Sequence, residues 1–178
     1  MAKRIVAILS TSMMIVLFFS LNSPVKSDVQ ANQYAIQKIV FLGVKFQNDH
    51  ESQEPTSEAE RSRIKSLEDI FKSKLQETNR YKFLELPNEI KAKIEHGVII
   101  GDCGGCEYDF GTDSAADISS WIVVQKVSNL ILNINLYMAD TKNRKISFSQ
   151  SVDIRGNTDE SWRRGMNYII NNHILKNN

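Results

Sequence analysis

The sequence predicts one α/β domain with a mixed sheet of about five strands, an antiparallel carboxyl-terminal meander and helices packed on the sheet. Strand and helix patterns alternate in the first half, three strand patterns follow one another from Trp121, and an amphipathic helix closes the chain. Alternation favours a sheet covered by helices, whereas strands with one polar face favour antiparallel pairing. The length after removal of a leader suits one domain.

The amino terminus has the pattern of a secretory signal peptide. Lys3 and Arg4 precede an apolar stretch at 5–21, and a polar segment with Pro24 leads to small-residue cleavage patterns. We expect removal of residues 1–27, with a second candidate cleavage after residue 31, leaving one domain at 28–178. The apolar stretch is short for an uncleaved anchor. The sequence therefore predicts a Sec-exported periplasmic protein, with secretion to the medium as the alternative.

The charge balance argues against a nucleic-acid partner. Loss of Lys3, Arg4 and Lys26 with the signal leaves 19 of the 22 basic residues against 21 acidic ones. A protein that neutralises phosphates needs a basic face, which this balance does not supply. Outside the signal, no stretch of the sequence reaches membrane-spanning length. We expect a soluble domain without a membrane span after cleavage.

The first strand and the first helix have clear patterns. Residues 38–46 are almost continuously apolar and β-branched, which predicts a strand buried on both faces. Ser57 and Glu60 then have the spacing of a capping box. An amphipathic helix is expected to follow as far as about residue 78, with its apolar stripe at Ile64, Leu67, Phe71 and Leu75.

Short elements occupy the middle of the chain. Residues 80–86 predict a strand, and 87–97 predict a helix with Pro87 in its first turn and Gly97 beyond its end. Residues 98–100 suggest a further short strand before the cysteine segment. The stretch at 121–127 predicts a buried strand.

Two alternating stretches predict the meander, joined by a turn at 139–145. The inward positions are expected to be Leu130, Leu132, Ile134, Leu136 and Met138, then Ile146, Phe148, Val152 and Ile154. A final helix is capped by Asn157 or Thr158. Its apolar face holds Trp162, Met166, Ile169, Ile170 and His173, where the histidine fits a core edge better than a ligand.

Cys103 and Cys106 are the only cysteines and stand as Cys-Gly-Gly-Cys. In an exported protein this spacing favours a disulfide that pins a loop. A redox site is the first alternative, but such enzymes usually carry a later cis-proline, and all three prolines precede Cys103. A zinc site is the second, although only His96 and Asp102 lie near in sequence as further ligands. We expect no cofactor and no metal.

Three stretches carry a resemblance to a known family: 102–107, 125–136 and 152–165. They resemble an uncharacterised bacterial periplasmic family, the domain-of-unknown-function family numbered 2380. Members commonly have a cysteine pair and a helix ending in a Gly-Ala-Asp-like turn. Ser114 to Asp117 depart from that turn, which implies an irregular helix here. The element order is more distantly similar to TolB amino-terminal, CsgG and LpoB-type envelope domains, which implies a three-layer domain that binds proteins and catalyses nothing.

Polar residues concentrate at the start of the last helix. Arginines and free backbone N–H groups at a helix start favour an anionic ligand, whereas capping and ion pairing explain the same residues structurally. The predicted binding patch consists of Asp153, Arg155, Asn157, Asp159, Glu160, Trp162, Arg163 and Arg164. No catalytic constellation or phosphate-binding loop occurs. The sequence thus predicts a non-enzymatic envelope protein that binds another protein. The alternatives are a secreted interaction factor and a periplasmic thiol–disulfide protein.

Overall fold

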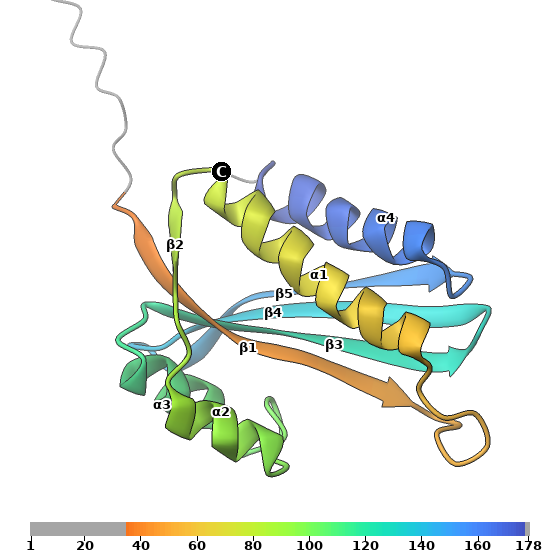
Figure 1. The fold of residues 1–178 in the computed structure, drawn as a ribbon. Helices are drawn as coiled ribbons and strands as arrows, with labels where there is room; N and C mark the ends of the chain where they lie inside the picture. Colours follow the sequence, from red (N-terminus) through yellow and green to blue (C-terminus); the bar gives the residue numbers. More distant parts are fainter. Residues whose placement is uncertain (1–34, 177–178) are drawn as a thin grey trace, which may run out of the picture. The chain divides into compact units, whose positions relative to one another are not determined.

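The computed structural model describes residues 35–176, so the predicted signal peptide lies outside the described residues. The elements follow the order β-α-β-α-α-β-β-β-α (Figure 1). Their bounds are β1 Gln37–Asn48, α1 Glu58–Gln76, β2 Tyr81–Leu84, α2 Asn88–Glu95, α3 Cys106–Asp113, β3 Ile118–Ser128, β4 Ile131–Asp140, β5 Lys145–Arg155 and α4 Asp159–Ile169, continued by a π-helical turn, η1, at Ile170–Ile174.

The five strands form one mixed sheet in the order β2-β1-β3-β4-β5. β1 pairs in parallel with β2 and with β3, placing Ile39 opposite Ile118. β3, β4 and β5 pair antiparallel as the predicted meander. The predicted fold class, a single α/β domain with a five-stranded mixed sheet, is confirmed.

Helices α1 and α4 lie side by side over one face of the sheet (Figure 1). Ser57 caps α1, and the predicted capping box with Glu60 is present. Thr158 caps α4 in the same way, with Ser161 as the reciprocal partner. Trp162 is buried among the apolar side chains of α1 and the sheet, so this face holds the larger core.

Helices α2 and α3 belong to the opposite face and cover only part of it (Figure 1). Their smaller core gathers around Trp121, Val40 and Phe110. Gly111 lets α3 approach the sheet closely, because a Cβ there would overlap the side chain of Thr141. The expected irregularity of this helix was wrong, since α3 is regular up to Asp113.

Four local predictions were also wrong. The second half of β1 is only half-buried, so that strand is not buried on both faces along its whole length. Residues 98–100 form no strand. Leu130 is 73% exposed because it lies in the turn before β4. Ile146 is 43% exposed, because a bulge in the β4–β5 pairing turns it to the opposite face from Phe148. Among the described residues, no helix combines the length and the apolar character that crossing a membrane requires.

Candidate functional site

The half of the sheet that α2 and α3 leave uncovered contains a groove of about 530 Å³. One wall is the loop before α3, and the floor consists of side chains from β1, β3, β4 and β5. We call this hollow the sheet groove. Its lining is Lys45, Gln47, Ile99, Ile100, Gly101, Asp102, Glu107, Tyr108, Trp121, Val123, Gln125, Tyr137, Ile146 and Ser149.

The groove has an aromatic floor and an apolar rim. Trp121 and Tyr137 stack across β3 and β4 with ring centroids 5.2 Å apart. Gly101 lets the loop pack on this pair, since its Cβ position lies 3.3 Å from the indole Nε1 of Trp121. Ile99 and Ile146 stand at the rim, about two-fifths exposed. The groove therefore combines exposed apolar surface with the amide and hydroxyl groups of the sheet.

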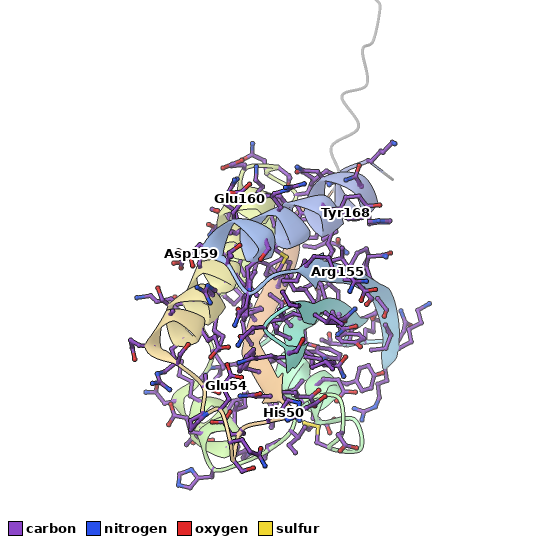
Figure 2. All side chains as sticks on the ribbon, turned by 90° about the vertical axis from the view of Figure 1, so that its right-hand side faces the viewer. His50, Glu54, Arg155, Asp159, Glu160 and Tyr168 are labelled. Carbon is purple, nitrogen blue, oxygen red and sulfur yellow. A yellow bond between two sulfur atoms is a disulfide. The ribbon has the colours of Figure 1, made fainter. Side chains whose placement is uncertain are left out.

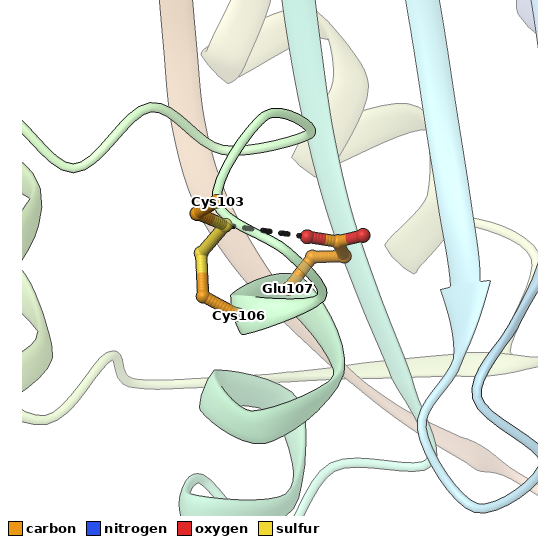
Figure 3. Close-up of a disulfide and its surroundings, with 3 residues drawn as sticks. All are labelled: Cys103, Cys106 and Glu107. Atoms are coloured by element: carbon orange, nitrogen blue, oxygen red, sulfur yellow. Dashed lines mark hydrogen bonds between the residues drawn. A yellow bond between two sulfur atoms is a disulfide. The ribbon is translucent and has the colours of Figure 1, made fainter.

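A disulfide closes the loop at one wall of the groove. The structure joins Cys103 to Cys106, and α3 begins at Cys106 (Figure 3). The next residue, Glu107, is only 7% exposed. Its carboxylate oxygen lies 3.4 Å from the Sγ of Cys103. A disulfide sulfur has no proton to give, so among the described residues this buried carboxylate has no hydrogen-bond donor.

The predicted binding patch divides into two parts, and Asn157 is the centre of the first. Its side-chain amide donates to Glu60 at 2.7 Å and to Asn129 at 3.0 Å. Its oxygen accepts from Trp162 at 2.9 Å and from Arg63 at 3.1 Å. Asn157 thus joins α1, the β3–β4 turn and the start of α4, which is a structural role.

Glu60 connects the same network to the sheet. Its carboxylate pairs with Lys126 at 2.8 Å, and the exposed fractions of the two side chains are 2% and 1%. Burial alone raises the pKa of Glu60, but hydrogen bonds from Lys126, Ser57 and Asn157 outweigh it and lower that pKa to about 2. The pKa of Lys126 is raised, because its bonds to Glu60 and Glu54 outweigh burial.

The second part of the patch lies on the surface. Asp159 pairs with Arg63 of α1 at 2.7 Å, and Glu160 pairs with Arg163. Arg155 and Arg164 instead line a hollow of about 500 Å³ between β5 and α4, together with Asp153 and Tyr168. Figure 2 shows Arg155 on β5 and Tyr168 on α4 above it, with Asp159 beside α1. The structure therefore places Arg155 and Arg164 in the same hollow. The adjacent Arg163 is engaged elsewhere, in its ion pair with Glu160.

His96 and Asp102, the further ligands considered for the alternative zinc site, are not part of the cysteine group in the described residues. His96 lies at the end of α2, where its Nδ1 is 2.6 Å from the carbonyl oxygen of Ala92. His173 packs edge-on against Tyr168 at the end of α4, which agrees with a core-edge position. Within the described residues, the group that could hold a metal ion is Cys103, Cys106 and Glu107. Adjacency of Glu107 to Cys106 was visible in the sequence, but its burial was not.

The part of the chain that the structure describes matches one family model over almost its whole length. The family model described as "Protein of unknown function (DUF2380)" matches residues 37–174, from the start of β1 to the end of η1. The chain belongs to this family. The predicted resemblance is therefore confirmed, and the DUF2380 domain accounts for nearly all of the described chain.

Solved structures similar to this DUF2380 domain share little sequence with it. The LpoB carboxyl-terminal domain from Salmonella enterica is 11% identical with a TM-score of 0.46, over 68% of this chain and 84% of that one. Lipoprotein GNA1162 from Neisseria meningitidis is 12% identical with a TM-score of 0.45, over 69% and 83%. TolB from Acinetobacter baumannii is 9% identical with a TM-score of 0.45, over 76% and 26%. No curated protein matches.

Proposed function

We propose that this DUF2380 protein is an exported, non-enzymatic accessory protein of the cell envelope that works in the periplasm by binding another protein in the sheet groove. The observation that carries the proposal is the unequal covering of the sheet. Two long helices pack along one face, whereas the other face keeps the groove with its aromatic floor and isoleucine rim. We therefore expect a partner to bind on the face of the sheet that α2 and α3 cover only in part.

The chemistry of the groove suits a polypeptide. Interfaces between proteins combine an apolar centre with aromatic side chains and a polar rim. Here Ile99 and Ile146 offer exposed apolar side chains whose burial is favourable. Tyr137 forms part of the floor and is backed by Trp121, which is only 4% exposed. Gln47, Gln125 and Ser149 add hydrogen-bonding groups along the strands. A partner segment could therefore bury apolar side chains and satisfy its polar groups in the same hollow.

Part of the predicted binding patch supports a second contact. Arg155 and Arg164 line one hollow beside Tyr168, and no ion pair within residues 35–176 engages either arginine. Guanidinium groups at such a place favour carboxylates of a partner. The other residues of the patch, from Asn157 to Arg163, are engaged in the fold. The arginine hollow is therefore proposed as an auxiliary surface.

Site-specific cross-linking tests the groove. A photoreactive phenylalanine analogue placed at Ile99 or at Ile146 is expected to give a covalent adduct of one defined mass in envelope fractions. The control position is Lys65, which is exposed on α1 on the opposite face. A second substitution, Tyr137→Ala, should reduce the adduct at both groove positions. Equal adducts at Lys65, or none at the groove positions, would overturn the proposal.

Fractionation tests the compartment. We propose cleavage near residue 27 and retention in the periplasm, so the mature protein should leave cells with the osmotic-shock fluid. Recovery mainly from the culture medium would favour the secreted interaction factor instead. Amino-terminal sequencing of the recovered protein distinguishes a start at Asp28 from a start at Asn32.

A further inference from the structure

The Cys103–Cys106 disulfide and the Glu107 carboxylate form a polar group at one wall of the sheet groove. Glu107 is 7% exposed and lines the sheet groove, and the polar neighbour of its carboxylate is a sulfur atom that cannot donate a proton (Figure 3). A mostly buried polar group without a hydrogen-bond donor calls for an explanation. Opening the disulfide supplies a partner, because the freed sulfur can carry a proton or bind a cation.

We propose that the dithiol form of Cys103 and Cys106, together with Glu107, is a binding site for a zinc-class divalent cation. The ligand atoms of the three residues lie within 4.8 Å of one another. Two thiolates and a carboxylate are ligands that Zn²⁺ accepts, and a tetrahedral ion would keep a fourth position for water or a partner group. This proposal goes beyond protein binding, and the site shares Glu107 with the lining of the sheet groove.

The distances suit a tetrahedral ion. With Zn–S of about 2.3 Å and Zn–O of about 2.1 Å, the sulfur and oxygen ligands lie about 3.6 Å apart. The Sγ of Cys103 and the oxygen of Glu107 are already 3.4 Å apart. The two cysteine Cα atoms are 5.5 Å apart, so side-chain rotation separates the sulfurs to the required distance of about 3.8 Å. The backbone therefore needs little rearrangement.

The start of α3 favours a thiolate at Cys106, and one cation, Arg144, lies near the group. Cys106 is the first residue of α3, where free backbone N–H groups stabilise a negative sulfur. The nearby cation Arg144 is paired with Asp109, lies over the ring of Tyr108 and also interacts electrostatically with Glu107. Glu107 also lines the sheet groove, so an ion bound here is reached from that side.

Opening and closing the Cys103–Cys106 bond require an external dithiol and an external disulfide, respectively, as redox partners. Exchange with an external dithiol opens the Cys103–Cys106 bond, adds two protons and two electrons to the sulfurs, and converts the external dithiol to its disulfide. Binding of M²⁺ then releases the two thiol protons. In the reverse direction an external disulfide takes two electrons and two protons, the sulfur–sulfur bond forms again and the ion leaves. The disulfide is thus the closed form of the site.

Titration with Co²⁺ tests the site, since cobalt–thiolate bonds absorb strongly in the near ultraviolet. The purified protein, reduced with a phosphine, should bind one equivalent of Co²⁺ with a thiolate charge-transfer band, and Zn²⁺ should displace it. Glu107→Gln should weaken binding by at least about tenfold. The matched control is Asp113→Asn, an exposed carboxylate of the same helix, which should leave affinity unchanged.

Two further samples complete the experiment. The oxidised protein and the Cys103→Ser/Cys106→Ser double variant should give no thiolate band. Circular dichroism of each reduced sample reports whether the domain stays folded. Absence of a stoichiometric band in the folded, reduced protein would overturn the proposal, as would equal affinity in Glu107→Gln. Unfolding on reduction that Zn²⁺ does not reverse would overturn it as well.

Discussion

Two buried carboxylates of this domain differ in almost everything but their burial. Glu60 accepts hydrogen bonds from Ser57, Lys126 and Asn157, and its pKa falls to about 2. Glu107 is nearly as buried but has a disulfide sulfur as its polar neighbour. A buried charge with all its partners stabilises the fold, whereas a mostly buried polar group without a donor calls for another explanation. The comparison separates the structural face of the sheet from the face that we propose to be functional.

The largest loss of stability is expected from removing Lys126, the countercharge of the buried Glu60 carboxylate. Lys126→Met leaves Glu60 buried without its countercharge, and we expect the free energy of unfolding to fall by about 4 kcal/mol. Urea denaturation followed by tryptophan fluorescence measures the change. The matched control is Lys72→Met, which removes an ion pair with Glu68 on the exposed side of α1 and should cost below about 0.5 kcal/mol.

A double variant tests whether the unpaired Glu60 charge causes the loss of stability in Lys126→Met. Lys126→Met with Glu60→Gln removes both charges, so it should recover part of the stability lost in the single variant. A loss below about 1 kcal/mol for Lys126→Met, or equal losses for Lys126→Met and Lys72→Met, would contradict the role given to the buried pair.

Acid should weaken the same buried pair. The pKa of Glu60 is lowered from 4.5 to about 2 in the folded state, so its contribution is fully present above about pH 4.5 and is lost as the pH falls towards 2. The shift corresponds to up to about 3 kcal/mol. Denaturation between pH 5 and pH 2.5 should show a steeper fall for the wild type than for Glu60→Gln. Parallel pH profiles for the two proteins would contradict this assignment.

The smallest change in stability is expected from substitution of Glu107. Glu107→Gln replaces a carboxylate whose polar neighbour is a disulfide sulfur and not a hydrogen-bond donor, so stability should change by less than about 1 kcal/mol in the oxidised protein. The same urea experiment measures it, with Glu60→Gln as the opposite case. If Glu107→Gln destabilised the fold as much as Glu60→Gln does, the distinction between the two carboxylates would be lost.

Much of the fold could be predicted because its signals are local. The capping box of Ser57 and Glu60, the apolar stripe of α1 and the alternation of β4 each lie within a few residues. Such patterns determine secondary structure and which face is buried. The five-stranded mixed sheet followed from the order of these elements.

The wrong predictions concern residues whose burial depends on strand pairing or on tertiary contacts. The bulge that turns Ile146 outward belongs to the register between β4 and β5, and a shift of one residue reverses every following side chain. The β3–β4 turn takes Leu130 away from the core. The groove, the burial of Glu107 and the hydrogen bonds of Asn157 to α1 and the β3–β4 turn all depend on residues distant in sequence. Periodicity contains no information about such contacts.

The position of β1 in the sheet has a consequence for the order of folding. Its two partners are β2, about 44 residues later, and β3, about 79 residues later, whereas β3, β4 and β5 pair with their immediate neighbours. Closing long loops costs entropy before any contact repays it. We therefore expect the meander to assemble early and β1 to join last, so the first strand of the chain completes the domain that it begins.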